Sequence, residues 1–118
     1  MLHPDDAKLR GLNNGDVVRV FNQRGACLGG VIIDDQVMQG VVQMSTGAWY
    51  DPLQPGVHGS LCKHGNPNLL TPDIGTSQLA QGPISHTCMV QIEGFKGELP
   101  ELTAFDAPKI SLINTSMV

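Results

Sequence analysis

The sequence predicts a mainly β protein, folded as a closed barrel with a few short helices. Hydrophobic residues make up 41% of the 118 residues and aromatic residues only 4%, so the core must rest on Val, Ile and Leu. The Val and Ile residues occur in short runs, and short runs of β-branched residues favour strands. A chain of this length forms one domain by default. Several short strands with Gly-rich turns are typical of a closed β-barrel.

The chain opens with a predicted short helix over residues 4–10. Pro4 suits the first helical position, and His3 precedes it at the cap. Acidic residues fall in the first turn and basic residues in the last, as the helix dipole favours. Gly11 can end the helix in a left-handed conformation, and a turn is expected at residues 13–16.

Two strands are predicted next, over residues 16–21 and 26–33. Gly25 suits a bulged hairpin between them. The pair Gly29-Gly30 inside the second strand indicates a bend or another backbone crossing close by.

Two further strands are expected over residues 41–44 and 87–92. The second shows the alternation of a half-buried strand, because Cys88, Val90 and Ile92 share one face. Between these strands, Thr71-Pro72-Asp73 can begin a short helical turn that Gly82-Pro83 ends.

The periodic pattern ends at Gly94. We therefore expect a ligand-binding β-barrel domain over residues 3–93. Residues 94–118 are expected to form a C-terminal tail that lies on a surface or is disordered.

Charge and cysteine content exclude several classes of protein. The net charge is −4 and no basic patch is present, so we expect no nucleic-acid partner. The three cysteines Cys27, Cys62 and Cys88 are odd in number and widely spaced, which does not fit a disulfide framework. We expect no membrane-spanning segment, and the first residues do not show the basic-then-apolar pattern of a signal peptide.

Residues 59–82 are the most informative stretch, because they follow neither the helical nor the strand period. Gly65, Gly75 and Gly82 can let a polar ligand approach the backbone closely. Long irregular stretches are uncommon in compact domains unless they are functional. We interpret this stretch as a ligand-facing loop, with a plain surface loop as the alternative.

Three blocks in this order resemble the C-terminal cofactor-binding domain of molybdenum oxidoreductases. They are HPDDA to NGDVV (residues 3–18), STGAWYDP (residues 45–52) and CKHGNPNLLT to DIGTSQLAQ (residues 62–81). The group that looks most similar contains the dimethyl sulfoxide, trimethylamine N-oxide and biotin sulfoxide reductases. Residues 73–78 and 103–110 look most like the biotin sulfoxide enzyme.

The resemblance implies a six-stranded double-psi β-barrel with short helices. The implied cofactor is bis-molybdopterin guanine dinucleotide around one molybdenum, with the other domains of a parent S- or N-oxide reductase as partners. The family's serine ligand to molybdenum lies in an earlier domain. This chain therefore carries no catalytic residue, and alone it should be inactive. A biotin sulfoxide type implies a cytoplasmic parent, with the periplasm as the alternative.

A domain of net charge −4 must hold pyrophosphates through local N–H groups, helix N-termini and single lysines. Side-chain amides match a pterin or guanine edge. The candidate cofactor-binding residues are Thr46, Gly47, Lys63, His64, Gly65, Asn66, Asn68, Thr76, Ser77 and Gln81.

Each candidate has a structural alternative. Asn66-Pro67-Asn68 is also typical of an Asx turn, and His64 can be a satisfied loop histidine. Lys63 can be a solvated side chain. Trp49 and Tyr50 can stack on a flat ring, but filling of the barrel is the preferred interpretation.

Other functions compete with cofactor binding. Cys62, His64, His86 and Cys88 could form a zinc site if neighbouring strands meet, although one intervening residue in each pair is unusual spacing. A free-standing double-psi barrel that binds a partner is a further alternative. Gly59-Ser60 resembles the self-cleaving bond of pyruvoyl-dependent decarboxylases, with no other likeness to them.

Overall fold

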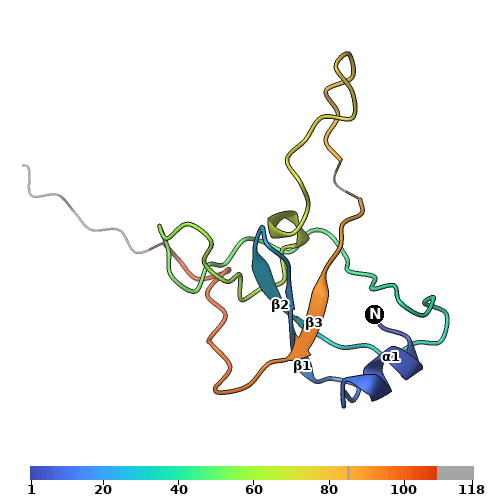
Figure 1. Ribbon diagram of the computed structural model, residues 1–118. Coiled ribbons are helices and arrows are strands. Elements are labelled where there is room, and N and C mark those ends of the chain that lie inside the picture. The colour runs from blue at the N-terminus through green and yellow to red at the C-terminus, as the bar shows by residue number, and fades with distance from the viewer. Residues whose placement is uncertain (85, 109–118) are drawn as a thin grey trace, which may run out of the picture.

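The computed structural model describes residues 1–84 and 86–108. Within them, the centre is an antiparallel sheet of β1 (Val17–Phe21), β2 (Ala26–Gly30) and β3 (Gln91–Gly94), in the order β2-β1-β3 (Figure 1). Val18 lies opposite Gly29 of β2 and Gly94 of β3. The prediction of a mainly β protein with few helices is confirmed.

The predicted first helix is α1 (Pro4–Leu9). The His3 ring accepts a hydrogen bond from the Asp5 amide at 3.1 Å, which caps the helix. Gly11 follows the helix with φ 65°, the left-handed conformation expected there.

The hairpin between β1 and β2 forms as predicted, but without the predicted bulge, because the register is unbroken from Val17 opposite Gly30 to Phe21 opposite Ala26. The Asn22 side chain accepts from the amides of Arg24 and Gly25 at 2.9 and 3.3 Å. A Cβ atom on Gly25 would lie 2.8 Å from the Leu69 carbonyl oxygen, so a second chain segment crosses this turn closely. β2 ends at Gly30, three residues before the predicted end at residue 33.

Two predicted strands need correction. No strand forms over residues 41–44, where Val42 makes one isolated bridge to Leu2. The N-terminal partner is too short to support a longer ladder. The late strand begins at Gln91 rather than at residue 87. Its predicted face is confirmed, because Cys88, Val90 and Ile92 pack against the core.

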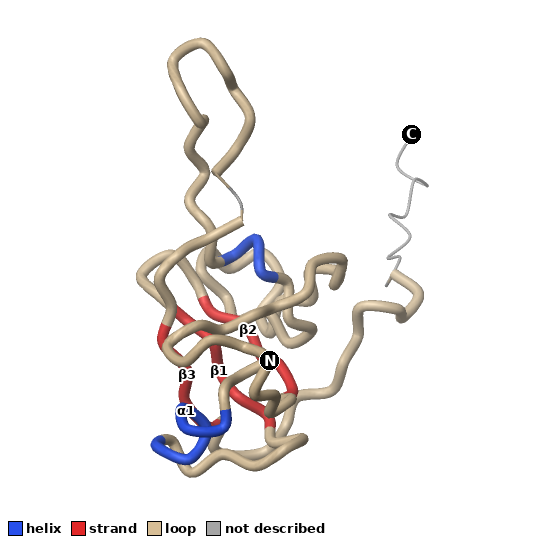
Figure 2. The backbone as a smooth tube through the Cα atoms, turned by 90° about the vertical axis from the view of Figure 1, so that its right-hand side faces the viewer, coloured by secondary structure: helices blue, strands red, loops and turns tan. Residues whose placement is uncertain are grey.

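The predicted helical turn over residues 71–83 is wrong. The short helix lies earlier, as the 3-10 helix η1 (Pro67–Leu69). Residues 72–84 instead form an exposed arm that stands away from the sheet (Figures 1 and 2). The Ile84 amide donates to the Ile74 carbonyl at 2.9 Å, and the Thr76 amide donates to the Gly82 carbonyl at 2.8 Å. Hydrogen bonds between the two sides of the arm therefore take the place of helical hydrogen bonds.

The core lies around two fully buried cysteines, Cys27 and Cys62. Buried Leu2, Ala7, Leu12, Val18, Val20, Val31 and Leu70 complete it. The pKa of the Cys27 thiol is raised to about 12, mainly by burial and secondly by the neighbouring Cys62. The thiol therefore stays protonated and behaves as a small apolar side chain. No helix in the described residues is long and apolar enough to cross a membrane.

Candidate ligand-binding site

The predicted ligand-facing loop over residues 59–82, called the polar stretch below, is anchored at Cys62, which lies beside β2. The Leu28 amide donates to the Cys62 carbonyl and the Cys62 amide donates to the Ala26 carbonyl, both at 3.0 Å. On its other side, Cys62 forms an antiparallel bridge with Pro52. Residues 63–66 are therefore held at the edge of the sheet by a paired backbone.

Gly65 is required by the fold at this edge. Its φ is 83°, and a Cβ atom there would lie 2.9 Å from the Leu28 carbonyl oxygen. The sequence suggested that this glycine opens the backbone to a ligand. The structure shows that it also opens the backbone to a neighbouring strand.

Lys63 lies inside a buried polar network rather than in solvent, which corrects the preference for a solvated side chain. Its side chain is 9% exposed, and the ammonium lies 3.5 Å from Asp51 Oδ1. The ammonium also donates to the Thr103 hydroxyl oxygen at 2.9 Å. Thr103 in turn donates its hydroxyl and its amide to Asp51, at 2.7 and 2.8 Å.

Asp51 is ionised at neutral pH within this network. Burial alone would raise the pKa of its carboxyl. The hydrogen bonds from the Thr103 hydroxyl and amide, together with the Lys63 ammonium, outweigh burial and lower the pKa below its ordinary value. The network therefore holds one carboxylate and one ammonium with little contact to water.

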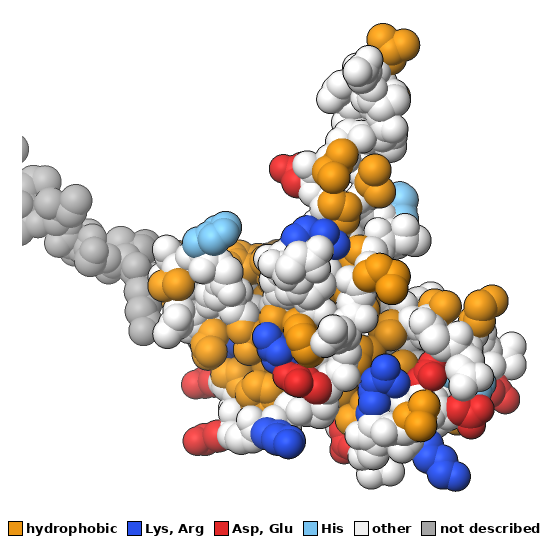
Figure 3. Space-filling model, viewed as in Figure 1, with side chains coloured by type: hydrophobic (Ala, Val, Ile, Leu, Met, Phe, Trp, Pro, Cys, Tyr) orange, Lys and Arg blue, Asp and Glu red, His pale blue; other side chains and the backbone are white. Residues whose placement is uncertain are grey.

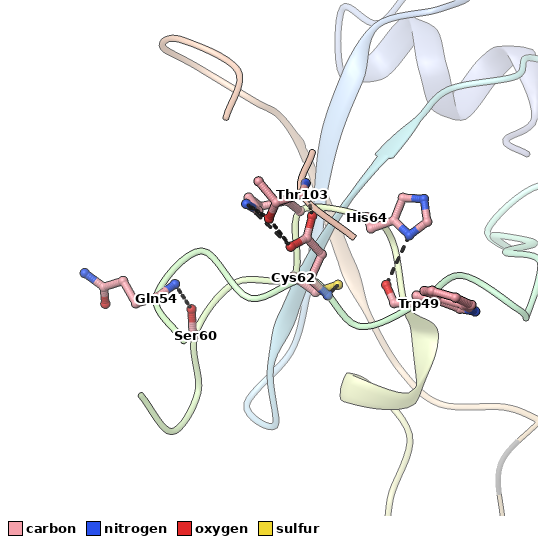
Figure 4. A network of polar contacts seen from close by, with 8 residues as sticks. Trp49, Gln54, Ser60, Cys62, His64 and Thr103 are labelled. Carbon is pink, nitrogen blue, oxygen red and sulfur yellow. Dashed lines mark hydrogen bonds and ion pairs between the residues drawn. The ribbon is translucent and has the colours of Figure 1, made fainter. Parts of the chain in front are cut away.

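Trp49 and His64 lie next to this network (Figure 4) and form an aromatic cluster with Phe105. The Phe105 ring lies 5.3 Å from the Trp49 ring and 5.1 Å from the His64 ring, between centroids. The His64 Nδ1 atom lies 3.1 Å from the Trp49 carbonyl oxygen. Trp49 and Tyr50 are 62% and 49% exposed, so the preferred interpretation that they fill the barrel is wrong.

The turn alternative is confirmed for one of the two asparagines. The Asn66 side-chain oxygen accepts from the Asn68 amide at 2.9 Å and caps η1. Its side-chain NH₂ group remains a donor. The Asn68 side chain is exposed and makes no hydrogen bond to another described residue.

Thr46 borders a groove of about 400 Å³ that also reaches Pro67 and Thr71. Its walls are apolar, with Val20, Met44, Val90 and Ile92 among them. Gly47 follows Thr46 in an exposed turn with φ 103°. The structure therefore brings Thr46 and Pro67 to one groove, although they are distant in sequence.

The other three candidates lie together in the arm. The Thr76 hydroxyl donates to the Ala80 carbonyl at 3.0 Å, and the Ser77 hydroxyl oxygen accepts from the Ala80 amide at 2.8 Å. The Gln81 side chain donates to the Gln78 carbonyl at 3.1 Å. Hydrophobic side chains also lie along the arm and at its tip (Figure 3). These polar groups therefore stabilise the arm itself and are not next to Thr46 or Lys63.

Two runs of backbone amides are left without a hydrogen-bond acceptor among the described residues. The backbone N–H groups of residues 45–50 and 64–66 donate no hydrogen bond within the part of the chain that the structure describes. Such N–H groups hold phosphate oxygens without a net positive charge. With the Asn66 and Asn68 amides, they fit a ligand that combines a pyrophosphate with a heterocyclic edge.

The zinc alternative needs Cys62, His64, His86 and Cys88 in one place. Cys62 is fully buried against β2, and its sulfur accepts from the Asp51 amide at 3.4 Å. The described residues contain no group of three His, Cys, Asp or Glu side chains placed to hold a metal ion.

Residues 1–89 match the family described as the molydopterin dinucleotide binding domain. The chain belongs to this family. The cofactor that the family implies is molybdopterin guanine dinucleotide with molybdenum, and the unbonded amides and exposed asparagine described above fit such a group.

The relatives are oxide reductases by name. The chain is 52% identical over 107 residues to trimethylamine-N-oxide reductase 1 of Escherichia coli O157:H7. It is 51% identical over 107 residues to the trimethylamine-N-oxide reductase of Salmonella typhimurium, and 48% identical over the same length to that of Vibrio cholerae. Each match covers 91% of this chain and 13% of the relative.

Sequence reasoning missed Asp51, Thr103 and Phe105 as parts of the site. Asp51 and Thr103 lie 52 residues apart, so no local pattern could pair them. The only signal was that both lie in blocks that resemble the family, at residues 45–52 and 103–110.

Proposed function

We propose that this chain binds the bis-molybdopterin guanine dinucleotide cofactor of a molybdenum enzyme that reduces an oxide substrate. The observation that carries the proposal is the set of unbonded backbone amides at residues 45–50 and 64–66, together with the exposed Asn68 side chain. A pyrophosphate can accept from these amides, and a guanine or pterin edge can pair with the asparagine.

The binding surface that we propose has two parts. Thr46, Gly47, Asn66 and Asn68 form the part near the groove. Lys63, His64 and Gly65 form the part at the sheet edge, where the amides of His64 and Gly65 are unbonded and the Lys63 amide donates to Asp51. Thr76, Ser77 and Gln81 belong to the arm. We propose that they meet the cofactor from a different side, because the arm stands away from the sheet (Figure 1).

The proposed barrel is the six-stranded double-psi type over residues 3–93. Its support is the set of isolated bridges outside the three strands, since Leu2 pairs with both Ile33 and Val42, and Cys62 pairs with both Cys27 and Pro52. These bridges extend the pairing beyond the central sheet. Residues 94–118 are proposed to be a C-terminal tail, of which residues up to 108 are described.

The substrate class that we propose is an N-oxide. The support is the name of the relatives, which are trimethylamine-N-oxide reductases at 48–52% identity. Biotin sulfoxide and dimethyl sulfoxide are the competing substrates. Reduction rates of the parent enzyme with trimethylamine N-oxide, biotin sulfoxide and dimethyl sulfoxide will distinguish between them. The family resemblance then implies a periplasmic parent, whereas a biotin sulfoxide type would be cytoplasmic.

The catalytic groups are proposed to lie elsewhere in the parent. The chain spans about an eighth of the length of the relatives it matches and supplies position and electrostatics to a cofactor that carries the redox chemistry. Its partners are therefore the cofactor and the remaining domains of the parent enzyme.

The test of this proposal is Asn68→Ala in the parent enzyme, followed by measurement of its molybdenum and guanine content. An unpaired buried partner costs about 1–3 kcal/mol, so roughly tenfold weaker retention is expected. Gln23→Ala, which removes an exposed amide in the β1–β2 turn, is the control and should leave retention unchanged. Equal cofactor content in Asn68→Ala and the control would refute Asn68 as a contact.

A further inference from the structure

The C-terminal segment closes over the stretch that carries Lys63 and His64. After β3 the chain runs back to the loops around residues 49–63 (Figure 1). There, Thr103 supplies two donors to one buried carboxylate, with its amide 2.8 Å from Asp51 Oδ2 and its hydroxyl 2.7 Å from Asp51 Oδ1. Both carboxylate oxygens are thus bonded by one residue of the segment.

The same threonine accepts from the cation of the network. The Lys63 ammonium donates to the Thr103 hydroxyl oxygen at 2.9 Å, and the Lys63 amide donates to the Asp51 carbonyl at 2.8 Å. The side chains of Lys63 and Asp51 are 9% and 6% exposed. Hydrogen bonds shielded from water in this way keep more of their strength. Thr103 therefore joins the side chains of Asp51 and Lys63, two residues whose backbones are bonded to each other, to the C-terminal segment.

Phe105 makes a second, apolar contact. Its ring lies against both Trp49 and His64, with centroid distances of 5.3 and 5.1 Å. Leu99, Pro100 and Leu102 border a hollow of about 270 Å³ that Lys63 and His64 also line. The segment therefore touches the stretch at a polar point and along an apolar surface.

We infer that residues 99–108 act as a clasp, in which Thr103 and Phe105 are positioning residues for Lys63, His64 and Gly65. This inference rests on the proposed function, because it gives the clasp the role of ordering the amides that meet the cofactor. The Lys63 ammonium already contacts Asp51 and Thr103. Residues 63–65 therefore present backbone groups to a ligand rather than a free positive charge. A segment that is already ordered before the ligand binds loses less conformational entropy on binding.

The first test uses amide hydrogen exchange in the full chain. Thr103→Val removes the hydroxyl and keeps the side-chain shape, whereas Thr103→Ser keeps the hydroxyl. In Thr103→Val, the Lys63 amide should exchange at least about tenfold faster, while the amides of Val18 and Val20 in β1 keep their rates. Thr103→Ser should behave as the wild type. An unchanged Lys63 rate, or an equal rise in β1, would overturn the clasp.

The second test uses the only tryptophan of the chain, Trp49. Phe105→Ala uncovers one side of its ring, so quenching of its fluorescence by acrylamide should increase. Leu79→Ala, at the arm tip where the side chain is 99% exposed, is the control and should leave quenching unchanged. Equal quenching in wild type and Phe105→Ala would contradict the apolar contact of the clasp.

The third test measures cofactor release from the parent holoenzyme. We expect faster loss of guanine nucleotide in Thr103→Val and restored retention in Thr103→Ser. If retention falls in Asn68→Ala but not in Thr103→Val, the clasp is overturned and the proposed function stands. If neither variant loses cofactor, both the clasp's role and the proposed binding surface are overturned.

Discussion

Gly65→Ala tests whether the backbone crossing between residue 65 and β2 is what fixes the polar stretch. The added Cβ would lie 2.9 Å from the Leu28 carbonyl oxygen, a backbone atom that cannot rotate away. Gly56→Ala is a matched control. Gly56 has φ 80° against 83° for Gly65, and an added Cβ there would meet nothing within 4 Å.

The difference between the two variants isolates the crossing. Both carry the cost of a left-handed alanine, about 1–2 kcal/mol. Only Gly65→Ala must also push two chain segments apart, which costs about 1–3 kcal/mol more by analogy with overpacked cores. We therefore expect the free energy of unfolding to fall by about 2–5 kcal/mol in Gly65→Ala and by about 1–2 kcal/mol in Gly56→Ala.

The assay is urea unfolding of the full chain, followed by circular dichroism and by Trp49 fluorescence. Coincident transitions with both probes justify the two-state treatment. If the two alanine variants lose equal stability, the close contact with Leu28 does not exist in solution. The explanation of Gly65 by the fold would then be wrong, and its use for ligand approach would be the better explanation.

Two further predictions concern pH and local stability. The pKa of Asp51 is lowered in the folded chain, so its contribution to stability is complete above its unfolded pKa of about 3.9 and is lost as the pH falls through the folded value. The stability difference between wild type and Asp51→Asn should therefore be constant above about pH 5 and shrink below about pH 4; a constant difference in urea titrations down to pH 3 would contradict this. Amide exchange should be fast across residues 72–84 but slow at Cys62 and Lys63, whose amides donate to Ala26 and Asp51. Uniform exchange rates across both parts would count against this division.

Local chemistry predicted the local structure correctly. His3-Pro4 and Gly11 set the two ends of α1, and Asn22 with Gly25 sets the hairpin. Each of these signals acts within a few residues, so the sequence order alone contains it. The same holds for the Asx turn at Asn66, which was the structural alternative to cofactor contact.

Contacts between distant segments could not be predicted in this way. Lys63 looked like a solvated side chain because nothing near it in sequence is acidic. Its partner Asp51 and its acceptor Thr103 come from loops 12 and 40 residues away. The error over residues 71–83 has a related cause, since Thr71-Pro72-Asp73 is a valid helix start whose outcome depends on pairing between Ile74 and Ile84.

The polar stretch therefore divides into two parts with different physical origins. Residues 61–66 owe their shape to the chain itself, through the paired backbone of Cys62, the crossing at Gly65 and the bonds of Asp51. The arm owes its shape only to bonds within itself, and Leu79 at its tip is 99% exposed. A ligand that contacts both parts must order the arm but finds residues 61–66 already in place. Substitutions in the arm should then alter affinity through the cost of ordering, whereas substitutions at residues 61–66 alter the folded chain before any ligand binds.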